Sequence, residues 1–232
     1  MEVERVGKVK VLGLIPARGG SKSIANKNLV DLGGCPLIKW TIDAASNSSL
    51  SRVVVSTENQ EIAETCRSLG AEVPFVRPDS LASDDAQSID VVLHALEALV
   101  EQFDAVMLLQ PTSPFRTHDD INLALTMNHD GASVISVVPV DGTHPARMKF
   151  IEDGFLVDPP FVEEVENMPR QNLRPMYIRN GAIYLTTVND LKSHTFKGSK
   201  SRALVMPKER SLNIDSQFDL IVARAMVGGG LI

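Results

Sequence analysis

Short apolar runs rich in Val, Ile and Leu alternate with helical patterns along the first 140 residues of the chain. Strands that are apolar on both faces are typical of a parallel sheet covered by helices. We expect such strands at 8–15, 52–57, 72–76, 104–110 and 132–140. Repeated βα units predict an α/β fold that is Rossmann-like and doubly wound, with a mostly parallel sheet and helices on both faces.

Three helical patterns separate these strands, at 36–46, 58–70 and 86–102. The apolar residues of the third pattern fall on one helical face, namely Ile89, Val92, Leu93, Leu96, Leu99 and Val100. The adjacent acids Asp84 and Asp85 are expected to cap the amino end of this helix. Because right-handed crossovers place the loops after the strands on one edge of the sheet, we expect a ligand at that edge.

The alternation stops at about residue 141. The segment 141–176 contains five prolines and has no long helical face, and it is too long for a plain connection inside a compact domain. We therefore expect a single domain over 1–232 with an inserted arm at 141–176. Regular structure is predicted to resume as strands at 180–187 and 202–207 and as a helix at 216–227, where Ser216 and Asp219 have capping-box spacing.

Composition and charge exclude several classes of partner. The net charge is −6, yet residues 1–40 carry seven Lys/Arg against three Asp/Glu, so cations gather at one end. A nucleic-acid surface needs widely spread cations and aromatic platforms, and the chain has one Trp and two Tyr, so we expect a compact anion and no nucleic acid. No apolar run reaches the roughly 20 residues of a membrane span, and the first 20 residues are too charged for a signal peptide. These features predict a cytoplasmic protein with no membrane partner.

The cations concentrate in the loop "LIPARGGSKSIANKN", residues 14–28, directly after the first predicted strand. Gly19 and Gly20 allow the backbone to turn its N–H groups toward an anion. Arg18, Lys22 and Lys27 then supply the charge that a polyphosphate requires. The spacing matches neither a Walker A motif nor a Rossmann GxGxxG fingerprint. The alternative is a solvated glycine turn with scattered surface cations.

At these residues the chain resembles a known family. "IPARGGSKSIANKN" is similar to the signature of the acylneuraminate cytidylyltransferases, which include CMP-N-acetylneuraminate synthetases and enzymes acting on pseudaminic and legionaminic acids. Four further blocks follow in the family's order: "RPDSLASDDAQS" (77–88), "LLQPTSPFR" (108–116), "PRQNLRPMYIRNGAIYL" (169–185) and "NIDSQFDL" (213–220). The resemblance implies Mg2+-assisted transfer of CMP from CTP to the anomeric hydroxyl of a nine-carbon acidic sugar, with release of pyrophosphate. It also implies a homodimer in which the arm reaches the partner subunit.

The resemblance assigns most of the nucleotide site to the glycine-containing loop. It implies that the triphosphate is held by the loop around Gly19 and Gly20 together with the side chains of Arg18, Ser21, Lys22, Lys27 and Asn28. Arg18 and Lys27 would act in catalysis by stabilising the charge on the departing pyrophosphate. Arg77 and Ser88 match positions around the nucleotide. The alternative for Arg77 is a surface arginine held by Asp79.

The later blocks imply the sugar and metal sites. By resemblance, the sugar acid is contacted by Gln110, Arg170 and Tyr184. The guanidinium of Arg170 suits the carboxylate of the sugar acid. The alternative for Gln110 is a hydrogen bond to its own loop. Family members commonly read Asp-Ile-Asp in the last block, whereas this chain reads Asn213-Ile214-Asp215. The resemblance therefore implies a single Mg2+ held by the catalytic Asp215, with Asn213 offering a neutral oxygen.

Two other interpretations stay open at the level of sequence. One is a nucleotidyltransferase for another sugar, such as the eight-carbon Kdo, or one that uses GTP. The other is a nucleotide-binding module without catalysis, in which Asn213 is the lesion. Nothing in the sequence separates N-acetylneuraminic, pseudaminic and legionaminic acids as substrates.

Overall fold

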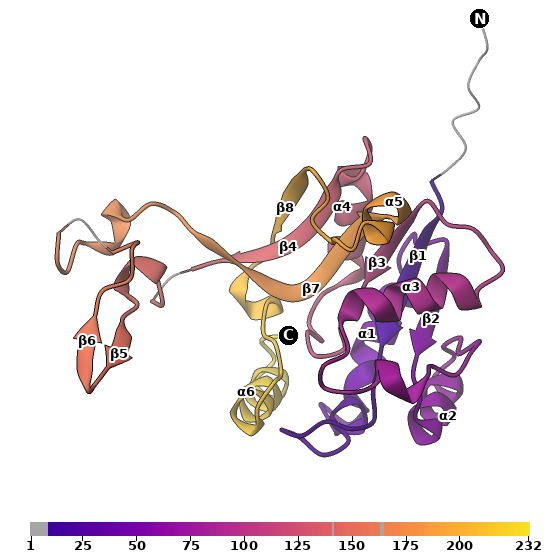
Figure 1. The fold of residues 1–232 in the computed structure, drawn as a ribbon. Coiled ribbons are helices and arrows are strands. Elements are labelled where there is room, and N and C mark those ends of the chain that lie inside the picture. Colours follow the sequence, from indigo (N-terminus) through magenta and orange to yellow (C-terminus); the bar gives the residue numbers. More distant parts are fainter. Residues whose placement is uncertain (1–8, 141, 163–164) are drawn as a thin grey trace, which may run out of the picture.

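The computed structural model describes residues 9–140, 142–162 and 165–232. Its main sheet contains six strands in the order β2-β1-β3-β7-β4-β8 (Figure 1). The strands are β1 (Val11–Pro16), β2 (Arg52–Ser56), β3 (Ala105–Leu108), β4 (Ser133–Pro139), β7 (Tyr177–Thr187) and β8 (Ser201–Val205). β7 runs antiparallel to β3 and β4, and the other described pairs of this sheet are parallel. The mostly parallel sheet predicted from the sequence is therefore confirmed.

Helices cover both faces of the sheet, as predicted. They are α1 (Leu37–Ser46), α2 (Gln60–Ser68), α3 (Ser88–Ala98), α4 (His118–Met127), α5 (Val188–Lys192) and α6 (Gln217–Gly228). Alternate residues of β1 belong to different cores: Ile15 packs with α1, α2 and α4, whereas Leu12 and Leu14 pack with α3 and α5. This division follows from the pleat, which sends successive side chains to opposite faces. The apolar strand pattern thus reflects burial on both sides.

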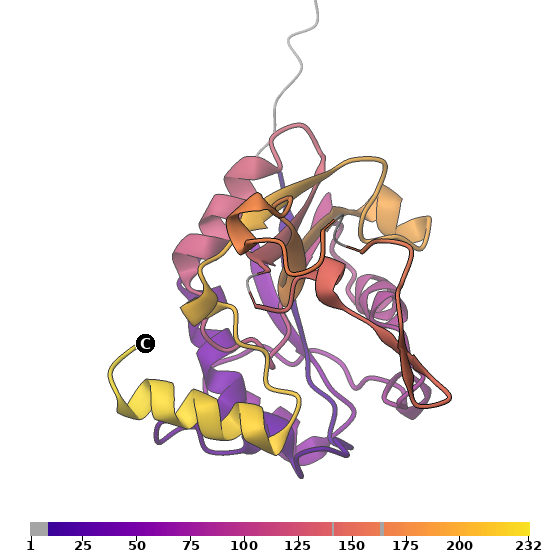
Figure 2. The same cartoon turned by 90° about the vertical axis from the view of Figure 1, so that its left-hand side faces the viewer.

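The C-terminal helix α6 closes a third apolar cluster beside the loop that follows β1 (Figure 2). Leu220 and Ala223 of α6 pack with Ile24, Leu32 and Ile214 in this cluster. The helix begins with a complete capping box, in which Ser216 and Asp219 each bond to the other's backbone N–H. The predicted capping spacing is confirmed, and α6 anchors both the cation-rich loop and the segment that contains Asp215.

The described part of the segment 141–176 forms an arm. It contains an antiparallel hairpin of β5 (Phe150–Glu152) and β6 (Phe155–Val157), turned at Asp153 and Gly154, both of which have positive φ. Figure 1 shows the hairpin well away from the main sheet, beyond the ends of β4 and β7. Short 3-10 helices lie here and elsewhere: η1 (Lys27–Leu29), η2 (Asp79–Leu81), η3 (Pro145–Arg147), η4 (Arg170–Asn172) and η5 (Lys208–Arg210). Residues 141 and 163–164 of the predicted arm lie outside the described residues, as do residues 1–8 of the N-terminus.

Two local predictions differ from the structure, and two helices were missed. In the predicted strand 72–76, Glu72 makes one isolated bridge to Val54 and the remainder is irregular, because Pro74 has no N–H to continue a ladder. The third predicted helix ends at Ala98, and Leu99 is extended, so Val100 is fully exposed instead of on the apolar face. The helices α4 and α5 were not predicted.

No described helix combines the length and the apolar character that crossing a bilayer requires.

Candidate active site

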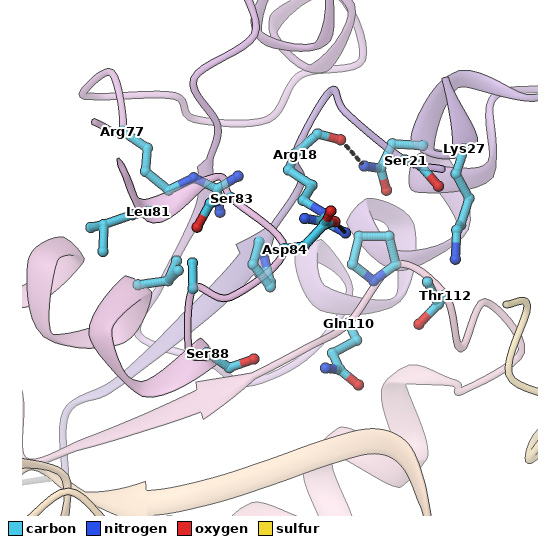
Figure 3. A pocket seen from close by; sticks show the side chains of 15 residues that line it. Arg18, Ser21, Lys27, Arg77, Leu81, Ser83, Asp84, Ser88, Gln110 and Thr112 are labelled. Atoms are coloured by element: carbon cyan, nitrogen blue, oxygen red, sulfur yellow. Dashed lines mark hydrogen bonds and ion pairs between the residues drawn. The ribbon is translucent and has the colours of Figure 1, made fainter. Parts of the chain in front are cut away.

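A cavity of about 260 Å³ lies at the carboxyl ends of β1 and β3 (Figure 3). Because these strands are parallel neighbours, the loops that follow them open on the same edge of the sheet. The cavity brings together seven of the residues predicted from the sequence, which are Arg18, Ser21, Lys27, Asn28, Arg77, Ser88 and Gln110. They come from the loop after β1, the segment 77–88 and the end of β3, so segments far apart in sequence form one site.

Asn28 fixes the shape of the cation-rich loop. Asn26, in a left-handed conformation, caps the amino end of η1, the 3-10 turn that contains Asn28. The buried Asn28 amide donates to the Arg18 carbonyl at 2.9 Å. Asn28 therefore holds the backbone from which the Arg18 guanidinium extends toward the cavity.

Each cation of the loop contacts a carboxylate. Arg18 Nη2 lies 2.8 Å from Asp84 Oδ1, and Lys22 contacts the other oxygen of Asp84. Lys27 Nζ, largely buried, donates to Asp215 Oδ1 at 3.0 Å and to the Ile214 carbonyl at 3.0 Å. Hydrogen bonds from Lys22 and Arg18, together with the charges of these side chains, hold the pKa of Asp84 below its usual range. Positive charge thus accumulates here as the sequence suggested, with acids placed against it.

The prediction that Asp84 and Asp85 cap the amino end of α3 is wrong. The N-cap of α3 is Gln87, which makes no side-chain capping bond, and Ser88 is the first residue of the helix. Asp84 lies three residues before that cap, where the cations Arg18 and Lys22 attract its carboxylate more strongly than a distant helix end does.

Glu58, which the sequence analysis did not single out, accepts a hydrogen bond from a backbone N–H of the loop. Its Oε1 accepts from the Gly19 N–H at 2.6 Å, so this N–H bonds to a protein carboxylate and is not left for a bound anion, contrary to the prediction from the sequence. Its Oε2 lies 2.6 Å from Arg77 Nη2. Burial raises the pKa of Glu58, but the bonds from Gly19 and Arg77 outweigh it and hold the pKa below the ordinary value. Gly20 is exposed, with open space where a Cβ would be.

Arg77 is buried, with 3% of its surface exposed, and Glu58 is its partner. The alternative of a surface arginine held by Asp79 is therefore wrong. The buried Nε of Arg77 has no hydrogen-bond partner among the described residues. A buried guanidinium with an unused donor in the lining of a cavity is suited to a polar ligand.

Gln110 follows β3 by two residues, and its side chain lies beside Gly181 of β7. Gly181 of β7 has φ +77°, and a Cβ there would lie 2.9 Å from Gln110 Oε1. The backbone of Gln110 accepts from the fully buried Arg116, which also donates to the Ala182 carbonyl at 2.8 Å and to Thr41 Oγ1 at 2.9 Å. Burial lowers the pKa of Arg116 to about 9. Arg116 thus fixes the loop that carries Gln110, a role that the sequence did not indicate.

Asp215 and Asn213 form the candidate metal site. Among the described residues, no three His, Cys, Asp or Glu side chains cluster closely enough to hold a metal by themselves. Mg2+, however, commonly takes one or two carboxylates and completes its shell with water and substrate phosphates. Asp215 is exposed beside Lys27, and the Asn213 amide contacts it. One carboxylate and one amide next to the Lys27 ammonium therefore fit a Mg2+ whose remaining ligands come from water and phosphate.

The other two predicted sugar contacts do not line this cavity. Tyr184 lies on β7 and packs with Phe196 at a ring-centroid distance of 5.7 Å, on the α3 side of the sheet. Arg170 begins η4 in the arm. Within one chain the structure therefore places Gln110 in the lining of the cavity and leaves Arg170 and Tyr184 outside that lining.

The fold and the site together define an α/β protein with a cation-rich loop beside a cavity at the carboxyl edge of its sheet, the edge at which such folds bind ligands. A family profile described as cytidylyltransferase matches residues 12–150. The chain belongs to this cytidylyltransferase family, a family of nucleotidyltransferases.

Individual relatives extend the match along most of the chain. A CMP-N,N'-diacetyllegionaminic acid synthase of Legionella pneumophila is 36% identical, over 91% of this chain and 93% of that protein. An N-acylneuraminate cytidylyltransferase of Streptococcus agalactiae is 34% identical over 92% of this chain, which spans 52% of that longer protein. The solved structure of a CMP-2-keto-3-deoxy-manno-octonic acid synthetase complexed with CTP superposes with a TM-score of 0.72 at 14% identity, covering 95% of this chain and 99% of that one. That likeness confirms the fold.

Proposed function

We propose that the protein transfers CMP from CTP to the anomeric hydroxyl of a nine-carbon acidic sugar of the sialic acid type and releases pyrophosphate, with Mg2+ as cofactor. The observation that carries the proposal is the meeting of Arg18 and Lys27 with Gln110 around one cavity. The relatives named above, which act on such sugar acids, support the choice of substrate class. We also propose a cytoplasmic location, because CTP is a cytoplasmic nucleotide.

The loop cations exchange partners when CTP binds. Arg18 and Lys22 leave Asp84 for the triphosphate, which carries more charge than one carboxylate. Arg77 and Ser88 contact the nucleotide from the opposite wall. The anomeric oxygen then bonds to the α-phosphorus as the bond to the pyrophosphate oxygen breaks, and the hydroxyl proton is released. Arg18 and Lys27 offset the charge that develops on the departing pyrophosphate.

Asp215 would hold the Mg2+, with Asn213 contributing a neutral oxygen. In the structure the Lys27 ammonium contacts the Asp215 carboxylate. When a nucleotide binds, its phosphates would attract the Lys27 ammonium, which leaves the Asp215 carboxylate available to Mg2+. When bound, Mg2+ neutralises phosphate oxygens whose charge would otherwise repel the incoming hydroxyl.

The sugar acid lies beyond the α-phosphate, where the Gln110 amide hydrogen-bonds its hydroxyls. We propose that Tyr184 lines the far end of this subsite. We also propose that the protein is a homodimer in which the arm of one subunit carries Arg170 to the site of the other, where the guanidinium pairs with the sugar carboxylate.

Pyrophosphate release tests the proposal. CTP and Mg2+ are offered with N-acetylneuraminic, pseudaminic, legionaminic and Kdo acids separately, with GTP, ATP and UTP in place of CTP as controls. We expect turnover with CTP and at least one nine-carbon acid and none with the other nucleotides. If CTP binds but no acid is turned over, the catalytic proposal is wrong and the non-catalytic module is the better interpretation. Turnover with Kdo alone would replace the substrate class.

A further inference from the structure

Glu58 connects the two walls of the nucleotide cavity. It follows β2 by two residues, and 13% of its side chain is exposed. One carboxylate oxygen accepts from the Gly19 N–H at 2.6 Å, and the other contacts Arg77 Nη2 at 2.6 Å. Gly19 adjoins Arg18 in the loop, whereas Arg77 lies on the wall formed by 77–88. A single carboxylate therefore ties together the two segments between which a nucleotide would lie.

The wall that contains Arg77 depends on the turn around Glu58. The backbone N–H of Arg77 donates to the Thr57 carbonyl at 3.0 Å, so the turn after β2 holds this residue by main chain as well as by side chain. Only 3% of Arg77 is exposed, and a buried guanidinium needs a counter-charge. Without Glu58, the arginine would leave this position or bury an unpaired charge.

The phosphate loop depends on the same turn. The Ala17 N–H donates to the Ser56 carbonyl at 2.9 Å, and the Gly19 N–H donates to Glu58. A Cβ on Gly19 would lie 2.5 Å from Asn59 Nδ2, so the loop packs directly on the residue that follows Glu58. Arg18 is held between these two anchored neighbours, and its direction is set by them.

We propose that Glu58 is a positioning residue for nucleoside triphosphate binding, which holds the loop of Arg18 at the distance from Arg77 that the nucleotide requires. The inference rests on the proposed function for the identity of the ligand. Glu58 itself does not contact the nucleotide, because both of its oxygens bond to the protein groups that it aligns.

The dissociation constant for CTP, measured by calorimetry without sugar acid, tests the proposal. Glu58→Gln keeps the shape but loses the charge and one oxygen. When its remaining oxygen accepts from the Gly19 N–H, its NH2 group faces the Arg77 guanidinium, and neither can accept from the other. We expect this variant to bind CTP roughly 10- to 100-fold more weakly, the scale of one lost charged hydrogen bond. Glu58→Asp keeps the charge but is one methylene shorter and cannot span both partners, so we expect a smaller loss. Glu61→Gln, an exposed acid in the first turn of α2, is the matched control and should bind CTP as the wild type does.

A double-mutant cycle separates positioning from general destabilisation. If Glu58 acts through Arg77, Glu58→Gln should change CTP binding less than about threefold when added to Arg77→Met. An undiminished effect in that background overturns the proposal, and so does CTP binding within threefold of wild type by a folded Glu58→Gln. If Glu58→Gln unfolds, Glu58→Asp decides by the same comparison.

The binding measurement is independent of turnover. If the wild type binds CTP but activates no sugar acid, the proposed reaction fails while the ratio of CTP affinities still decides the role of Glu58. In an active protein we further expect Glu58→Gln to raise the KM for CTP and to leave the KM for the sugar acid unchanged, a difference that a loss of folded protein would not produce.

Discussion

Asn213 and Asp215 lie two residues apart, and their side chains contact each other beside Lys27. In Asn213→Asp a second carboxylate replaces the amide, and two carboxylates bind Mg2+ more tightly than one. We expect the Mg2+ concentration for half-maximal rate to fall by about three- to tenfold, the scale of 1 kcal/mol or slightly more. A Mg2+ titration of turnover measures this. Asn189→Asp, at an exposed position on α5, is the control and should leave this Mg2+ concentration unchanged. If Asn213→Asp leaves the Mg2+ concentration for half-maximal rate unchanged or raises it, position 213 is not near the ion.

At the residue scale, the sequence predicted side chains whose role is local. Arg18 and Lys27 belong to one glycine-containing loop after a strand, so both their charge and their place at the sheet edge follow from neighbours in sequence. Glu58 and Arg116 were missed because their importance arises from partners distant along the chain, such as Gly19 and Ala182. Asp84 was misassigned for the same reason, since a helix cap is a local pattern whereas its contacts with cations depend on the tertiary fold.

At the element scale, the strands buried on both faces were predictable from their unbroken apolar runs, and β1, β3 and β4 appear where expected. The helix α4 was missed although Thr117 and Asp120 form a complete capping box at its start. The direction of β7 was also beyond the sequence, because an apolar strand has the same pattern whether it is parallel or antiparallel. This direction matters, since it places Gly181 of β7 beside the Gln110 side chain, which lines the cavity.

Gly181 marks the point where β7 meets Gln110, and Gly181→Ala tests that contact. Its φ of +77° disfavours any side chain, and the new Cβ would lie 2.9 Å from Gln110 Oε1. We expect a loss of about 1–2 kcal/mol in the free energy of unfolding, measured by urea titration. Because Gln110 must move, the KM for the sugar acid should rise more than the KM for CTP.

Gly131→Ala is the matched control for Gly181→Ala. Gly131 has the same φ of +77°, but a Cβ there would have only an ordinary contact, at 3.8 Å from Thr187 Cγ2. We expect a similar loss of stability from backbone strain and no change in either KM. Equal kinetic effects of the two substitutions would contradict the placement of Gln110 at the sugar.

At the scale of the whole molecule, the arm exposes apolar side chains that a lone chain does not cover. Ile151 and Leu156 form a cross-strand pair of the β5–β6 hairpin, and 75% and 74% of their surfaces are exposed. An isolated two-stranded hairpin is marginal in water, and a contiguous apolar surface of this kind marks a protein interface. We therefore expect the protein to sediment as a dimer. Leu156→Asp should weaken the dimer about tenfold or more, because it places an unpaired charge in the interface. Val100→Asp, at a fully exposed position just beyond the carboxyl end of α3, is the control and should not. If Arg170 acts across the dimer, Leu156→Asp should lose turnover per chain on dilution, as its weakened dimer dissociates, at concentrations where wild type keeps full turnover. A monomeric wild type with full activity would remove the arm from the active site.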